Sequence, residues 1–162
     1  MATVKFSSTI GRPAEDVFDL VANVGRNPEW CPGFTGAERL TAGPIGRGTA
    51  FRTAMRGMGD LEIRITEYER PRRLWFVGAA SAVEIGHGFV FTPDGAGTRV
   101  DQRIDVRPKG LLRLAAPLMA LTLKRRILTN TAALKAYLEH GATGRQPSRG
   151  THGPGAAARS AI

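Results

Sequence analysis

Hydrophobic and polar residues alternate along residues 98–107, and this alternation predicts a β-strand with one buried and one solvated face. Its apolar face would carry Thr98, Val100, Gln102, Ile104 and Val106, and its wet face Arg99, Asp101, Arg103, Asp105 and Arg107. A helical pattern follows the break at residues 108–110 and runs to about His140. Because a one-faced sheet must bury its apolar side, we expect it to pack on this last helix. A curved sheet around one long helix can enclose a ligand pocket.

The rest of the chain predicts six further strands and two short helices. The strands would span residues 3–10, 34–41, 49–55, 61–68, 74–78 and 83–92, with a hairpin at residues 57–60. One short helix would begin at Pro13, with Glu15 and Asp16 near its positive end. Residues 27–33 would form a second short helix or a tight turn. The predicted fold class is therefore α+β, with an antiparallel sheet of about seven strands.

Pro117 and a hydrophobic stripe define the last helix. An internal proline costs about 3 kcal/mol in a helix, so residues 111–116 are expected to form a short turn before the main helix. The helical period then places one stripe toward the sheet, formed by Ala120, Leu123, Ile127, Thr131, Leu134 and Leu138. Lys124, Arg125 and Arg126 are expected to point elsewhere.

Length and composition fit one soluble domain, since the chain has 162 residues, of which 42% are hydrophobic. We expect residues 1–140 to fold and residues 141–162, which contain almost no large apolar side chain, to form a disordered tail. Cys31 is the only cysteine, which excludes an intrachain disulfide. Residues 1–10 lack the apolar core of a signal peptide, and residues 111–123 are too short and interrupted to span a bilayer. These features predict a cytoplasmic protein.

The net charge of +9 is a nonspecific signal, and three of the cations, Arg145, Arg149 and Arg159, lie in the tail. The sequence has no helix-turn-helix, no zinc-finger spacing and no basic strand with aromatic residues, so we expect no nucleic-acid partner. Its three histidines have no metal-ligand spacing, and residues 43–48 do not match a phosphate loop. We therefore expect no metal and no cofactor.

Six short motifs, in this order, carry a family resemblance. They are residues 12–18 (RPAEDVF), 27–30 (NPEW), 43–49 (GPIGRGT), 65–74 (ITEYERPRRL), 97–100 (GTRV) and 134–139 (LKAYLE). With the order of elements, they make residues 3–140 resemble the polyketide cyclase/dehydrase and lipid-transport superfamily, the SRPBCC or START-like proteins. The resemblance implies a helix-grip fold with a cavity for an apolar or aromatic ligand. Some members cyclise or dehydrate polyketide chains, whereas others carry lipids, quinones or hormones, and no invariant catalytic set transfers to this chain.

His87 is the sharpest candidate for chemistry. It shares a predicted face with Val83, Ile85, Phe89 and Phe91, so it would point into the cavity. There it could donate a hydrogen bond to a carbonyl or act as a general acid or base. The alternative is a core histidine that bonds a backbone group. The flanking Gly86 and Gly88 fit a bulge, a close approach of ligand, or simple sheet curvature.

Other polar residues also have two interpretations. Gln102 and Asn130 could bond a ligand or satisfy a neighbour, for which Gln102 has His87 as a cross-strand candidate. Trp30 could contact ligand or simply pack, and Cys31 has no adjacent base to make it a nucleophile. Arg52 and Arg64 fall on predicted wet faces, but a one-residue shift of register would turn them inward, where they could stabilise an enolate.

The predicted ligand site combines these residues. His87 is the catalytic candidate, and the expected ligand contacts are Trp30, Phe51, Met55, Ile63, Phe76, Phe89, Gln102, Leu123, Ile127, Asn130 and Leu134. The hairpin at residues 57–60 and the Pro117 segment would gate the mouth.

Two functions compete, and the first is binding of a polyketide- or lipid-like molecule without chemistry. The second is a polyketide cyclase or dehydratase, which needs only one or two proton-transfer groups. Membrane docking through the basic end of the helix is a third and weaker interpretation of the function. We expect the protein to be a monomer or a homodimer.

Overall fold

The computed structural model describes residues 2–57, 59–80, 83–110 and 116–141, with side chains of the last segment described from residue 121 onward. Its elements are β1 (Ala2–Ile10), α1 (Ala14–Ala22), the 3-10 turn η1 (Val24–Arg26), α2 (Asn27–Trp30), β2 (Phe34–Arg39), β3 (Ala50–Met55), β4 (Gly59–Glu69), β5 (Arg73–Ala80), β6 (Val83–Asp94), β7 (Gly97–Pro108) and α3 (Ala116–His140). The predicted α+β class and order of elements are confirmed. Residues 59 and 60, expected in the hairpin turn, belong to β4 instead.

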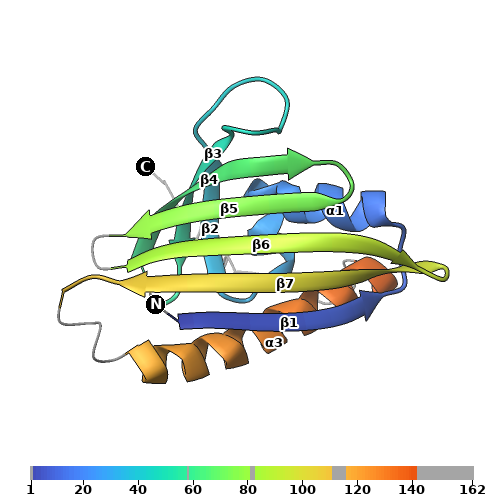
Figure 1. Ribbon diagram of the computed structural model, residues 1–162. Coiled ribbons are helices and arrows are strands. Elements are labelled where there is room, and N and C mark those ends of the chain that lie inside the picture. Colours follow the sequence, from blue (N-terminus) through green and yellow to red (C-terminus); the bar gives the residue numbers. More distant parts are fainter. Residues whose placement is uncertain (1, 58, 81–82, 111–115, 142–162) are drawn as a thin grey trace, which may run out of the picture.

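All seven strands form one antiparallel sheet in the order β1-β7-β6-β5-β4-β3-β2. The first strand pairs with the last, so that Val4 lies opposite Ile104. The sheet curves over α3, which crosses below it, while α1 lies at one end (Figure 1). This is the helix-grip arrangement.

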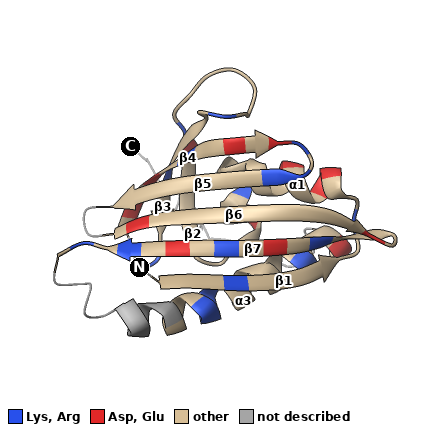
Figure 2. Ribbon diagram, in the orientation of Figure 1, with Lys and Arg blue, Asp and Glu red and all other residues tan. Residues whose placement is uncertain are grey.

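Burial alternates along the strands in the predicted register. On β7, Val100 and Ile104 are buried, whereas Arg99 and Arg103 are exposed on the outer face. Figure 2 shows the resulting alternation of basic and acidic positions along β7. On β3 and β4, the side chains of Arg52 and Arg64 are more than half exposed and pair with Glu38 and Glu62. The alternative register, which would turn these two arginines inward, is therefore wrong.

One end of the inner face is a packed core beneath α1. The Phe18 ring meets Tyr68 and Phe91 edge to face, with ring centroids 5.1 Å and 5.4 Å apart. Phe18 and Val17 are completely buried. The helix begins at Ala14, one residue after the predicted start, and Pro13 is the N-cap residue that precedes it.

The last helix begins at Ala116, one residue before the predicted start, and its inner stripe is as expected: Ile127, Thr131 and Leu134 are buried. The side chain of Ala120 and the turn expected at residues 111–115 lie outside the described residues, as does the tail from residue 142. No helix in the described part of the chain is long and apolar enough to cross a bilayer.

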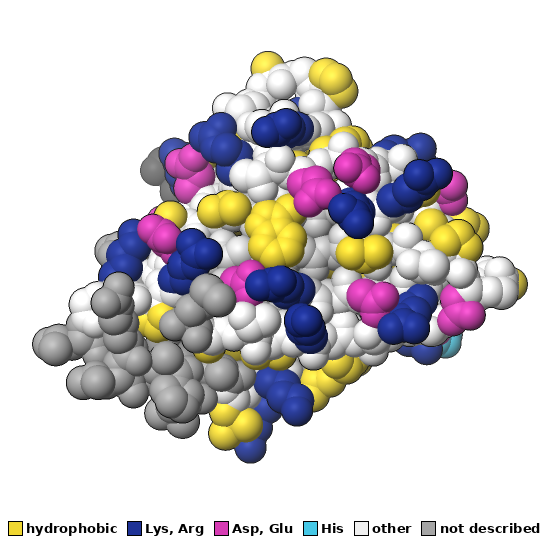
Figure 3. All heavy atoms as spheres, in the orientation of Figure 1, with side chains coloured by type: hydrophobic (Ala, Val, Ile, Leu, Met, Phe, Trp, Pro, Cys, Tyr) yellow, Lys and Arg dark blue, Asp and Glu magenta, His cyan; other side chains and the backbone are white. Residues whose placement is uncertain are grey.

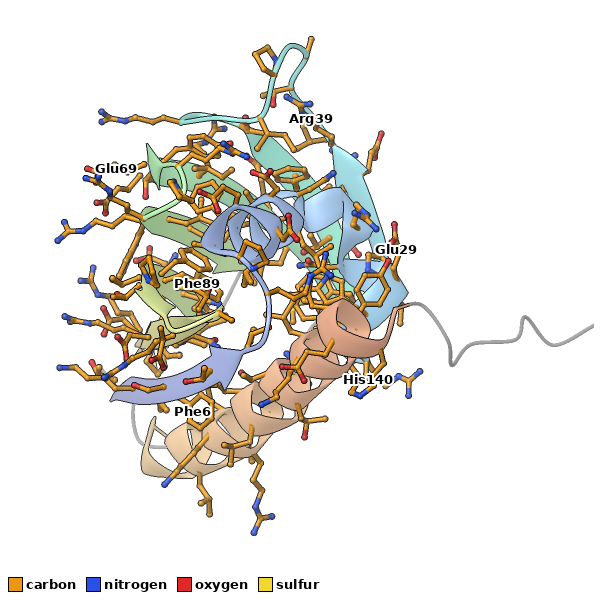
Figure 4. The ribbon with its side chains drawn as sticks, turned by 90° about the vertical axis from the view of Figure 1, so that its right-hand side faces the viewer. Phe6, Glu29, Arg39, Glu69, Phe89 and His140 are labelled. Carbon is orange, nitrogen blue, oxygen red and sulfur yellow. The ribbon has the colours of Figure 1, made fainter. Side chains whose placement is uncertain are left out.

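A three-residue cluster ties α3 to the segment formed by η1 and α2. Arg26 forms an ion pair with Glu29 at 2.8 Å and donates a hydrogen bond to the Tyr137 hydroxyl at 2.9 Å. That hydroxyl in turn donates to the Glu29 carboxylate at 2.6 Å. Figure 4 shows Glu29 close to the C-terminal part of α3. On the opposite side, Lys135 donates to the Thr9 carbonyl of β1 at 3.0 Å, so the helix is held at both edges.

Gly86 and Gly88, which flank His87, are explained neither by a bulge nor by a close approach of ligand nor by sheet curvature. Trp75 lies opposite Gly88 on the outer face, and its indole ring covers both glycines. A Cβ at Gly86 would lie 3.1 Å from the ring, and one at Gly88 would overlap it. Figure 3 shows hydrophobic side chains at the centre of this face, surrounded by charged ones. The two glycines therefore make room for an aromatic ring on the side of β6 opposite to His87.

We predict that Gly88→Ala lowers the free energy of unfolding by about 1–3 kcal/mol, because the new methyl group overpacks against Trp75. Chemical denaturation measures this loss. Gly46→Ala is the control, since a Cβ there meets no atom within 4 Å and its effect should stay within about 0.5 kcal/mol. In a Trp75→Val background, Gly88→Ala should also become nearly neutral; an equal loss in both backgrounds would contradict the overlap.

Candidate functional site

A cavity of about 140 Å³ lies between the inner face of the sheet and α3, with η1 and α2 closing one side. All but one of the predicted site residues line it: Trp30, Met55, Ile63, Phe76, His87, Phe89, Gln102, Leu123, Ile127, Asn130 and Leu134. Figure 4 shows Phe89 between the sheet and the helices. The structure thus brings these side chains together, while their contact with a ligand stays a prediction.

Phe51 is the exception, because it lies in the packed core and not at the cavity. Its side chain is fully inaccessible and clusters with Ile65 and Phe76. It shares a strand face with Met55, as expected, but lies two pleat repeats further along β3, in the cluster that includes the side chains of α1. The alternation of apolar and polar residues predicts which face of the sheet a side chain occupies. It does not predict whether that part of the face lies at the cavity or in the packed core.

Several lining residues were missed by the sequence interpretation. They are Val21, Val24, Asn27, Cys31, Phe34, Leu61, Gly78, Ile85, Ile104, Arg126 and Thr131. Strand alternation already placed Leu61, Ile85 and Ile104 on the inner face, and the helical stripe included Thr131, so the sequence pattern could have predicted these four as lining residues. No sequence pattern predicted the missed lining residues of η1, α2 and the start of β2. Arg126 corrects the expectation that it points elsewhere: it lies one turn from Leu123 and Asn130, at the edge of the stripe.

A chain of hydrogen bonds crosses the cavity wall from the sheet to α3. Gln102 Nε2 donates to Thr131 Oγ1 at 3.0 Å, and Gln102 Oε1 lies 3.3 Å from His87 Nε2. An amide oxygen only accepts, so Nε2 of the imidazole carries the proton and Nδ1 is left as an acceptor. Of the two interpretations of Gln102, pairing with His87 is therefore the one observed, and its side chain also faces the cavity.

Burial keeps His87 neutral. The imidazole lies beside the Phe89 ring, with centroids 4.1 Å apart and planes tilted by 33°, and His87 lines the cavity. Desolvation lowers the pKa of His87 to about 4, and the hydrogen bond to Gln102 opposes this only partly. At neutral pH the site therefore presents an uncharged imidazole.

The wall formed by α2 contains polar atoms without partners. Asn27 Oδ1 and Trp30 Nε1 are buried and form no hydrogen bond with the described residues. A buried polar atom left unpaired costs about 1–3 kcal/mol, so this wall is not fully satisfied by the protein itself. The neighbouring Cys31 is buried, which raises the pKa of its thiol to about 11 and leaves it protonated and unreactive at neutral pH.

Arg126 marks the edge of the cavity near the β3–β4 hairpin. Its Nη2 atom donates to the Arg56 carbonyl at 2.9 Å, which places α3 beside the end of β3. Arg126 and Met55 are both half-buried, so they lie between the cavity and solvent. Of the predicted gate, residue 58 and the Pro117 side chain lie outside the described residues. Among the residues that are described, no three His, Cys, Asp or Glu side chains cluster as metal ligands.

A cavity between a curved seven-stranded sheet and one long C-terminal helix, with two short helices after the first strand, defines a START-like helix-grip protein. The chain belongs to the family described as polyketide cyclase / dehydrase and lipid transport, which matches residues 1–139. No curated protein matches the sequence.

Solved structures share the fold at low sequence identity. A START superfamily protein from Mycobacterium smegmatis has a TM-score of 0.74 at 17% identity, over 85% of this chain and 97% of that one. The Zhui aromatase/cyclase from Streptomyces sp. R1128 has a TM-score of 0.72 at 16% identity, over 86% and 94%. The di-domain ARO/CYC BexL from the BE-7585A biosynthetic pathway has a TM-score of 0.70 at 20% identity, over 86% of this chain but 47% of its own. At these identities the likeness shows the fold alone.

The low pKa of His87 predicts a specific loss of stability in acid. An unfolded histidine takes up its proton near pH 6.5, whereas folded His87 resists until about pH 4, so protons favour the unfolded chain between these values. Between pH 7 and pH 5, His87 should contribute a loss of about 2 kcal/mol in the free energy of unfolding. The measurement is denaturant unfolding of the wild type and His87→Gln at both pH values; the other two histidines are common to both proteins and cancel. Equal losses in the two proteins would show that His87 is not held neutral.

Proposed function

We propose that the protein binds a hydrophobic or aromatic small molecule in the cavity between the sheet and α3, as a carrier or sensor without chemistry. The observation that carries the proposal is an apolar cavity, open at one edge, into which a few polar groups converge, which is the usual construction of a ligand site. Membership of the family fits a hydrophobic ligand.

The size of the cavity limits the ligand. Its volume of about 140 Å³ is close to that of an engineered apolar cavity, about 150 Å³, that holds one benzene molecule. It is smaller than the roughly 300–1,000 Å³ usual for drug-sized ligands. In this conformation the cavity therefore fits one ring or a short chain, and a longer polyketide would require α3 or the β3–β4 hairpin to move.

Electrostatics favours binding over catalysis. A general base works best when its pKa lies near the working pH, and the pKa of about 4 at His87 makes it a weak base. The Cys31 thiol stays protonated, so it is not a nucleophile. The lining residues that are described include no carboxylic acid to complete an acid–base pair.

A polyketide cyclase or dehydratase is the second candidate. Its specific support is His87 Nδ1, an acceptor on a cavity-lining ring that packs against Phe89. Two of the solved structures with this fold are the Zhui aromatase/cyclase and the di-domain ARO/CYC BexL. In such a reaction Nδ1 would take a proton from a carbon next to a carbonyl, and a developing enolate would raise the pKa of the imidazole while it does so.

We predict that filling the cavity abolishes binding. The test is native mass spectrometry with a panel of single-ring aromatics, linear poly-ketone mimics, quinones and fatty acids. Ile85→Trp places a larger side chain in the cavity and should lose the ligand, while Val77→Trp, on the exposed outer face, should keep it. Retention of ligand by a folded Ile85→Trp protein, or no ligand from the panel on the wild type, would count against the cavity.

The two candidates differ in what happens to the bound molecule. A carrier returns every panel compound with its mass unchanged, in the wild type and in His87→Gln alike. A cyclase or dehydratase gives loss of water or a cyclised product with the poly-ketone mimics, and His87→Gln should reduce that rate at least about a hundredfold, the usual contribution of a general base. Product formation at the same rate in both proteins would remove His87 from the chemistry.

A further inference from the structure

One charged side chain, Arg126, lies among the described residues that line the cavity. The remainder of the described lining is apolar or neutral, since His87 is uncharged and Cys31 is a thiol. No glutamate or aspartate of the lining balances the guanidinium. Within the described lining, the cavity therefore carries one positive charge, at its edge.

The described residues use only a small part of the hydrogen-bonding capacity of Arg126. A guanidinium has five N–H donors, and the structure assigns one bond, from Nη2 to the Arg56 carbonyl. Within the described part of the chain, no carboxylate forms an ion pair with Arg126. Most exposed arginines of the sheet differ in this respect: Arg52, Arg64, Arg99 and Arg103 each pair with an acid.

Asn130 lies beside Arg126 on the same face of α3. The two residues are four positions apart, so their side chains are neighbours on the helix surface, and both line the cavity. The Asn130 amide forms no hydrogen bond with the described residues, and it can donate two. A guanidinium and an amide donor side by side match the two oxygens of a carboxylate.

We infer that the ligand is an apolar monoanion, with its carboxylate held by Arg126 and Asn130 at the cavity edge and its ring or short chain against the inner face of the sheet. This inference rests on the proposed function, because it names the class of ligand for the same cavity. An anion at the edge keeps partial access to water, so its desolvation cost is smaller than in the apolar interior. The net charge of +9 also favours approach of an anion.

The test compares 3-phenylpropanoate with 3-phenylpropanamide, which has nearly the same shape and no charge. Dissociation constants come from NMR chemical-shift titrations of the labelled protein at neutral pH and low salt. The acid should bind the wild type about tenfold more tightly than the amide, as expected for a hydrogen-bonded pair of charges. Arg126→Met, which keeps an unbranched stem, should bring the two constants within about twofold of each other by weakening the acid alone.

Matched variants separate this pair from general attraction and from a structural role. Arg125→Gln removes an adjacent, exposed cation that does not line the cavity, and should keep the tenfold preference. Arg126→Lys should keep a preference of several-fold, and Arg126→Gln replaces the Met variant if that protein does not fold. A preference that survives loss of the Arg126 charge, or equal binding of acid and amide to the wild type, overturns the inference.

Failure of this inference is distinguishable from failure of the proposed function. Equal binding of both compounds, lost in Ile85→Trp, leaves the apolar cavity as a ligand site and overturns only the anion. Binding of neither compound overturns both. A Met variant that weakens acid and amide equally shows that Arg126 acts only by holding the β3–β4 hairpin through Arg56.

Discussion

The fold depends on covering the inner face of a sheet that is wider than any single helix. Seven strands about 4.8 Å apart span roughly 30 Å, whereas a helix with its side chains is about 10–12 Å across. α3 packs on the side of the inner face formed by β1, β7 and β6, α1 completes a packed core at one end, and η1 with α2 closes a side. The space left between them is the cavity. The cavity therefore exists because the helices do not cover the whole inner face of the sheet. Its selectivity for a ligand must come from the few polar groups that line it.

Those polar groups are arranged by depth. In the interior, His87, Gln102 and Thr131 satisfy one another without a net charge, so the apolar surroundings impose no cost of a buried ion. The same desolvation that keeps His87 neutral also weakens it as a base. The charge lies at the edge, on Arg126, where water is near. A site built in this way recognises an amphipathic molecule more readily than it activates one.

Local periodicity was sufficient to predict much of this architecture. Alternation on β7 and the stripe of Ile127, Thr131 and Leu134 depend on neighbours in sequence, and both are confirmed. How deeply a residue is buried along its strand, and why a glycine is needed at a position, depend on residues far apart in sequence. Phe51 lies in the core because it joins a cluster of buried side chains from α1, β4 and β5, and Gly88 is needed because Trp75 covers it from another strand. Arg126 was missed because a position at the margin of a helical stripe is decided by the partner surface, here the end of β3.

The pairing of β1 with β7 has a consequence for the order in which the protein is built. Thr3 and Asp105, which are hydrogen-bonded across this pair, are 102 residues apart in sequence. β7 is the neighbour of β1 at this edge of the sheet, so β1 has no partner strand on the ribosome until β7 has emerged. α3 follows β7 in the chain, so the inner face stays uncovered until after all seven strands have been made. Such long-range closure slows folding and leaves apolar surface open to other chains meanwhile. The newly made chain is therefore most vulnerable to aggregation just before its last helix docks.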